Sequence, residues 1–174
     1  TAVGNGYDPV AREQMMYAQY IAGQAFNSAG LDATHSISHA VSASFDTHHG
    51  MGNGIALTRV WEHNLSANYR KFARMAAAMV VDTRGMTDAQ AADAALETAV
   101  RLADDVGIPQ NFTNLPEYSK SRVGHHDMPA VSATDDDVAR ITEHAMGDVC
   151  TPTNPRILTP VAMEALVRDA LAGS

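Results

Sequence analysis

Apolar residues recur along this chain at the three- to four-residue spacing of helices, and no stretch alternates apolar and polar residues as a half-buried strand does. Seven segments carry the helical pattern: residues 9–30, 33–45, 51–61, 68–80, 87–107, 134–147 and 159–173. The pattern predicts an all-α fold, a bundle of about six to seven helices.

Several predicted helices have recognisable start signals. Asp8 before Pro9 is typical of an N-cap followed by proline in the first turn. Thr87 and Gln90 have the spacing of a capping box. The three aspartates after Thr134 favour a helix start, because negative charge stabilises the first turn, rather than a calcium loop.

The segment between Gly107 and Ala133 is polar and carries prolines and glycine, which indicates a long surface connection. Within it, His125, His126 and Asp127 are more simply read as solvated loop residues than as a metal site. No repeat or linker divides the chain, so we expect one helical domain over residues 1–174.

Charge and composition exclude some classes of partner. With 12 basic and 20 acidic residues, the net charge of −8 disfavours binding to nucleic acid. No apolar run is long enough to span a membrane. The single cysteine, Cys150, cannot form an internal disulfide, and we expect a cytoplasmic protein.

Four of the eight histidines lie between residues 35 and 49. His35 and His39 are four positions apart and share a helix face, and His49 follows across the next turn. Such a group could hold one metal or one substrate. Ser36 stands where zinc proteases carry their glutamate, so peptidase activity is not indicated. An isolated pair at this spacing is more often hydrogen-bonded within a core, and three histidines alone leave a metal shell incomplete.

A family resemblance adds to this pattern. Its elements are the segment 11–27, the three histidines with Gly50 and Asn53, and the segments 148–151 and 154–156. Together they resemble the C-terminal half of the iron-dependent (type III) alcohol dehydrogenases, most closely the methanol dehydrogenase branch. The chain departs from the family pattern at residues 40–42, where many relatives have Pro-Leu-Gly, and at His48, which replaces a common proline.

The resemblance implies a role for each matched residue. His35 and His49 would bind the catalytic metal, Fe2+ or Zn2+. His39 would lie beside the nicotinamide and pass on the proton of the alcohol, as the catalytic residue. Phe26 and Cys150 would line the substrate pocket.

The resemblance also implies the reaction, which is NAD- or NADP-linked oxidation of short primary alcohols such as methanol or ethanol to aldehydes. Relatives carry an N-terminal nucleotide-binding domain that supplies an aspartate and a further histidine to the metal. We expect that domain to lie outside these 174 residues, because no Gly-rich turn joins a strand to a helix here. Gly50, Gly52 and Gly54 lie where two helical segments meet, and packing or a turn is the simpler explanation for them. We therefore expect the isolated chain to be inactive, and the enzyme to be a homo-oligomer.

Two alternatives remain open at this point. One is a non-catalytic helical module for binding or assembly. The other is a hydroxyacid-oxoacid transhydrogenase, which would need a basic residue to hold a carboxylate, and Arg156 is the candidate.

Overall fold

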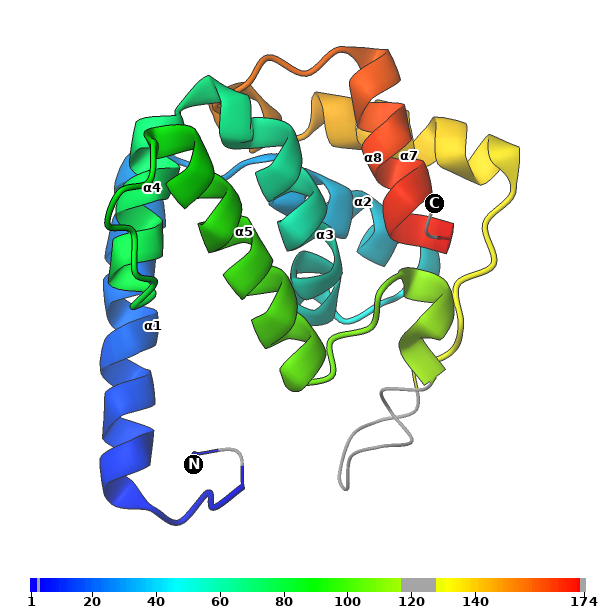
Figure 1. The fold of residues 1–174 in the computed structure, drawn as a ribbon. Helices are drawn as coiled ribbons and strands as arrows, with labels where there is room; N and C mark the ends of the chain where they lie inside the picture. Colours follow the sequence, from blue (N-terminus) through cyan, green and yellow to red (C-terminus); the bar gives the residue numbers. More distant parts are fainter. Residues whose placement is uncertain (3, 117–127, 173–174) are drawn as a thin grey trace. The chain divides into compact units, whose positions relative to one another are not determined.

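The computed structural model describes residues 1–2, 4–116 and 128–172. These residues form seven α-helices and short 3-10 turns without a strand, which confirms the all-α prediction (Figure 1). The chain divides into two compact units, residues 1–31 and 32–174. No helix in the described ranges has the length and apolar character needed to cross a membrane. The histidine and aspartate group at residues 125–127 lies outside the described residues.

The first unit consists mainly of α1, Pro9–Ala29. The carboxylate of Asp8 accepts hydrogen bonds from the backbone N–H groups of Val10 and Ala11, which confirms the predicted N-cap. The helix ends at Gly30, whose φ of 80° suits glycine. Its large apolar side chains are exposed, among them Met15, Met16, Tyr17, Tyr20, Ile21 and Phe26.

The second unit contains the other described helices. In chain order they are α2 (Ala33–Phe45), α3 (His49–Asn64), α4 (Tyr69–Ala78), α5 (Asp88–Asp105), α7 (Asp135–Gly147) and α8 (Pro160–Ala172). Helix α2 packs against α3 and α7, and α8 packs against α7 and α3. Helices α4 and α5 pack against each other beside the far end of α3 (Figure 1).

The main hydrophobic core lies where α2, α3, α7 and α8 meet. Ile37, Ile55, Ile141 and Val167 supply one fully buried side chain from each of these helices. The segment after Gly107 also enters this core. Phe112 and Leu115 are fully buried, so the prediction of a surface connection is wrong for this part of the segment.

A smaller core joins the end of α3 to α4 and α5. Trp61 stacks on Phe72 at a ring separation of 5.6 Å, and alanines of α5 fill the space beside them. The predicted capping box of α5 is present, because Thr87 and Gln90 each bond the other's backbone N–H.

Helix α3 begins earlier than the sequence pattern indicates, at His49 directly after the cap residue His48. Gly50, Gly52 and Gly54 therefore all lie inside its first turns. Gly52 has a packing reason for being glycine, since a Cβ there would lie 2.5 Å from Ser38 Oγ. This close approach brings the start of α3 onto the middle of α2, where the histidines lie.

Candidate active site

His35, His39 and His49 form one cluster of side chains. The first two project from α2, and the third opens α3. Their ring centroids are 6.0 Å apart for His35 and His39, 5.4 Å for His35 and His49, and 5.0 Å for His39 and His49. The spacing argument for a shared helix face is therefore confirmed, and the turn does bring His49 back.

Asn53, one turn further along α3, links two of these rings. Its Nδ2 lies 3.1 Å from His35 Nε2 and 3.1 Å from His49 Nε2. Its own Oδ1 is buried and has no hydrogen-bond partner among the residues that the structure describes. The Nε2 atoms of His35 and His49 therefore both face the Asn53 amide nitrogen, which donates one hydrogen to each of them. In the sequence, the one signal for Asn53 is its place in the family motif.

Asp148 follows the last residue of α7 and holds the third histidine. Its Oδ2 lies 2.9 Å from His39 Nδ1, and its Oδ1 accepts hydrogen bonds from the Cys150 backbone N–H and the Ser36 hydroxyl. No spacing pattern in the sequence marks this carboxylate as part of a site. Its only signal was its position at the start of the matched 148–151 motif.

Electrostatics at this site follow from burial and from these contacts. Burial opposes ionisation of Asp148, but the Cys150 N–H and His39 outweigh it and keep the pKa of this carboxyl below its ordinary value. Burial, and then the neighbouring His49, lower the pKa of His35. Burial and the Asp148 carboxylate raise the pKa of the Cys150 thiol to about 11. His35 and Cys150 are thus held in their neutral forms at neutral pH.

The cluster contains two donor sets that could bind a cation. The ligand atoms of His39, Asp148 and Cys150 lie within 4.8 Å of one another. However, His39 and Asp148 already bond each other, and the raised pKa of Cys150 opposes the thiolate that a metal requires. The pair His35 and His49 fits a metal better, because neutral imidazole nitrogens that converge on one point are typical ligands.

The other residues singled out from the sequence lie in different surroundings. Cys150 is buried beside Asp148, next to the cluster. Phe26 lies in the first unit, so its place in a substrate pocket stays a prediction. Arg156 donates to the His63 carbonyl near the end of α3, whereas His49 opens that helix. A 16-residue helix is about 24 Å long, so Arg156 is far from the cluster.

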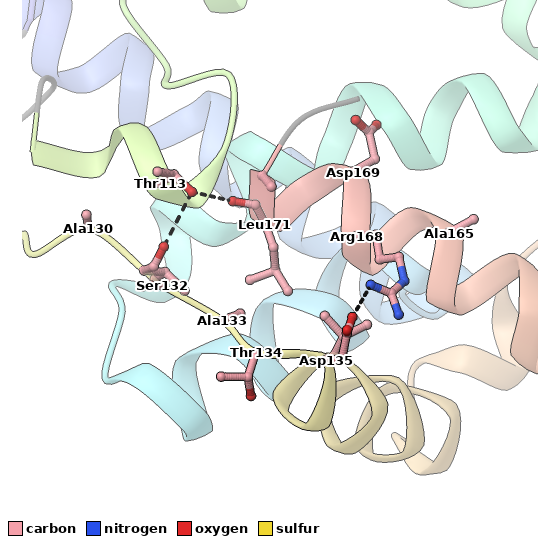
Figure 2. A pocket seen from close by; sticks show the side chains of 13 residues that line it. Thr113, Ala130, Ser132, Ala133, Thr134, Asp135, Ala165, Arg168, Asp169 and Leu171 are labelled. Atoms are coloured by element: carbon pink, nitrogen blue, oxygen red, sulfur yellow. Dashed lines mark hydrogen bonds and ion pairs between the residues drawn. The ribbon is translucent and has the colours of Figure 1, made fainter.

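A separate cavity of about 470 Å³ lies between α7 and α8, near the first turn of α7 (Figure 2). Arg168 and Asp135 form an ion pair of 2.7 Å at its wall. Asp148 lies beyond the opposite end of α7, and none of the predicted site residues lines the cavity. The histidine cluster is therefore the candidate active site.

Comparison with known proteins identifies the family of the chain. Residues 1–171 match the family described as Fe-containing alcohol dehydrogenase family, C-terminal. The chain is 54% identical over 170 residues to the methanol:N,N-dimethyl-4-nitrosoaniline oxidoreductase of a Mycobacterium species, covering 94% of this chain and 40% of that protein. It is 34% identical over 170 residues to the NAD-dependent methanol dehydrogenase of Bacillus methanolicus, covering 98% of this chain and 40% of that protein.

A solved structure shows the same arrangement of helices. A 1,3-propanediol oxidoreductase superposes with a TM-score of 0.83 at 32% sequence identity, over 97% of this chain and 40% of that one. The chain thus spans about 40% of the length of the relatives it matches.

Proposed function

Because the chain belongs to the iron-containing alcohol dehydrogenase family, we propose that residues 1–174 are the helical metal-binding part of an enzyme that oxidises short primary alcohols to aldehydes. The proposed cofactors are a divalent metal, Fe2+ or Zn2+, and NAD or NADP. Methanol and ethanol are the proposed substrates, since two relatives are named for methanol.

One observation carries this proposal: the Nε2 atoms of His35 and His49 both lie 3.1 Å from the same Asn53 nitrogen. We propose these two atoms as the metal ligands that this chain supplies, with Asn53 moving aside. Two imidazoles leave a metal shell incomplete, so the remaining ligands would come from outside residues 1–174. That would make the isolated chain a weak metal binder and inactive.

His39 is the proposed proton carrier. When bound, the metal supplies Lewis-acid chemistry and the nicotinamide accepts hydride. Asp148 accepts a hydrogen bond from the Nδ1–H of His39, which leaves Nε2 to take the proton that the alcohol releases. The His39 side chain is 42% exposed, so the ring can pass this proton to water. Cys150 and Phe26 are proposed to line the alcohol's side of the site.

The remaining features of the enzyme rest on the family alone. A nucleotide-binding domain would hold NAD or NADP, and the enzyme would be a cytoplasmic homo-oligomer. The non-catalytic alternative loses support from the ordered histidine cluster. The transhydrogenase alternative loses support from Arg156, whose guanidinium bonds the far end of α3.

The electron acceptor has a second candidate. The Mycobacterium relative is named for transfer to N,N-dimethyl-4-nitrosoaniline, whereas the Bacillus methanolicus relative is named for NAD. Both acceptors therefore belong in the assay.

The test is to graft residues 1–174 in place of the matching segment of the Mycobacterium relative and to assay the graft beside the isolated chain. We expect the graft to contain about one divalent metal per chain and to oxidise methanol or ethanol. His35→Ala and His49→Ala should remove both metal and activity. His144→Ala, an exposed histidine on α7, is the matched control.

Two results would overturn the proposal. The first is a folded graft that binds no metal or oxidises none of these alcohols with any of the acceptors. The second is a His35→Ala or His49→Ala graft that keeps its full metal content. Alcohol oxidation by the isolated chain would overturn the assignment of the missing ligands to another part of the enzyme.

A further inference from the structure

We infer that Ser38 is a positioning residue that fixes the tautomer of His49. Its hydroxyl holds the proton of the neutral ring on Nδ1, so that the Nε2 lone pair faces the centre of the cluster. The consequence for metal binding rests on the proposed function, but the tautomer itself does not.

The hydrogen-bond partners of Ser38 carry this inference. Ser38 Oγ lies 2.9 Å from the His49 carbonyl oxygen and 3.1 Å from His49 Nδ1. A hydroxyl has one hydrogen to donate, and a carbonyl oxygen can only accept. The Ser38 hydrogen is therefore used on the carbonyl, and the lone pair of Oγ is left for Nδ1. That contact is a hydrogen bond only if Nδ1 carries the proton.

The other side of the ring agrees with this assignment. With the proton on Nδ1, the Nε2 of neutral His49 is an acceptor. The Asn53 amide presents its nitrogen, the donor end, to Nε2 at 3.1 Å, and the same nitrogen serves His35 Nε2. The opposite tautomer would place an N–H of His49 against an N–H of Asn53. It would also give Ser38 two acceptors, His49 Nδ1 and the His49 carbonyl, for its one hydrogen, so one of these two contacts would not be a hydrogen bond.

Packing keeps Ser38 in this position. Its side chain is fully buried in the middle of α2, and it contacts the start of α3 where Gly52 has no Cβ. His49, by contrast, is exposed, so without this contact its ring would lose the partner that holds Nδ1. A buried hydroxyl that bonds both the ring and the carbonyl of one residue restrains the ring as well as the backbone.

A divalent metal needs a neutral imidazole with a free lone pair, and a hydrogen bond to the other ring nitrogen selects that form. Ser38 would therefore pre-organise His49 as a ligand before the metal arrives. Removing such a support typically weakens metal affinity by about 10- to 100-fold.

The test compares Ser38→Ala with Ser44→Ala in the 174-residue chain. Ser44 is the matched control, because it lies on the same helix and its hydroxyl bonds the Ala40 carbonyl, away from the histidines. The nitrogen-15 NMR signals of the histidine rings, recorded without metal above the pH at which histidines titrate, report the tautomer directly. A His49→Gln spectrum identifies the His49 signals.

We expect one His49 tautomer, with the proton on Nδ1, in the wild type and in Ser44→Ala. Ser38→Ala should show a mixture, with the Nε2–H form rising to a substantial share. A wild-type ring protonated mainly on Nε2 would overturn the inference. So would a Ser38→Ala spectrum that keeps the wild-type tautomer, since Ser38 would then support the backbone only.

Metal affinity supplies the second readout, measured in the graft by competition with a chelator for Zn2+. We expect Ser38→Ala to bind Zn2+ about 10- to 100-fold more weakly than Ser44→Ala. Equal affinities would overturn the pre-organisation of the ligand. Absence of Zn2+ binding in the unmutated graft would overturn the proposed function instead, while the NMR result on the metal-free chain still decides the role of Ser38.

Discussion

His39 Nδ1 and Asp148 Oδ2 lie 2.9 Å apart although 109 positions separate the two residues in the chain. The contact forms because α2 packs against α7, which ends one residue before Asp148. The Cys150 N–H and the Ser36 hydroxyl hold the second carboxylate oxygen, so the carboxylate has a fixed orientation. Because Asp148 holds Nδ1 of His39, Nε2 is the ring nitrogen that remains for proton transfer.

Replacing Asp148 with asparagine should impair proton transfer without removing the metal. A positioned proton carrier contributes about 10²- to 10⁴-fold to a rate, so we expect kcat for alcohol oxidation by the graft to fall by at least about 10-fold. Metal content should stay unchanged, because Asp148 bonds His39 and not the proposed ligands. Steady-state kinetics and metal analysis measure the two effects.

A double-mutant comparison separates positioning from a general loss of structure. His39→Asn with Asp148→Asn should be no slower than His39→Asn alone, because both changes remove the same step. Asp136→Asn, an exposed change in the first turn of α7, is the control. Additive losses for the two residues would show that Asp148 acts independently of His39.

Asp148 should also contribute to stability in a pH-dependent way. Its pKa in the folded protein lies below the ordinary value of 3.8, so the unfolded chain takes up this proton first as the pH falls. Its contribution is therefore complete above that value and is lost as the pH falls through the folded pKa. We expect the free energy of unfolding of Asp148→Asn to be lower than wild type at pH about 7, and the gap to shrink below pH about 4. Urea unfolding at both pH values measures it; a gap that widens in acid would contradict the assignment.

Much of the helical structure could be predicted because its signals are local. Asp8 caps α1 and Thr87 caps α5 through contacts within three residues, as their spacing indicates. The three aspartates after Thr134 also mark a helix start, and Asp137 completes a capping box there. The cluster of three histidines could also be predicted from the sequence, because two of them share a helix face and the third follows a short turn.

The residues that hold the histidine cluster in place could not be predicted from the sequence, because their contacts depend on which helices pack together. Asp148 reaches His39 only through the contact between α2 and α7. The same holds for Asn64 and Asn154, whose side-chain amides bond each other at 2.9 and 2.8 Å across 90 positions. The start of α3 was also misplaced, since three glycines within five residues are typical of a turn, whereas Gly52 is required by the approach of Ser38.

Cys150 should react slowly with alkylating reagents. Its thiol is buried and its pKa is raised to about 11, so only about 0.1% is thiolate at pH about 8. An unfolded chain with an ordinary thiol pKa of about 8.5 has roughly a quarter as thiolate. We expect labelling with iodoacetamide to be at least about 100-fold slower in the folded protein than in urea. Because the chain has one cysteine, intact mass measures this directly.

The Asp148→Asn variant refines the cysteine prediction. Removing the carboxylate charge removes one of the causes that raise the thiol pKa, so labelling of the folded variant should be faster than in the wild type. Asp136→Asn again serves as the control. Labelling of the folded wild type at the unfolded rate would show that neither burial nor Asp148 protects this thiol.

Gly52 and Gly54 should respond in opposite directions to alanine, although both lie in the first turns of α3. A Cβ at Gly52 would lie 2.5 Å from Ser38 Oγ and 3.2 Å from Ser38 Cβ, and such overpacking typically costs about 1–3 kcal/mol. At Gly54 the nearest atoms are methyl groups of Ile108 at 3.4 Å, an ordinary contact. Alanine is favoured over glycine in helices by up to about 1 kcal/mol, so Gly54→Ala should be neutral or stabilising.

Urea unfolding of the two alanine variants measures this difference, and a third variant identifies its cause. In Gly52→Ala with Ser38→Ala the 2.5 Å contact is gone, and the 3.2 Å contact between Cβ atoms and a 3.4 Å contact with the Phe112 ring are left. Part of the lost stability should therefore return, although the Ser38 hydrogen bonds to His49 are lost as well. Equal stability of Gly52→Ala and Gly54→Ala would show that α3 can move away from α2 at no cost. The close packing that brings His49 to Ser38 would then not be what holds the histidine cluster together.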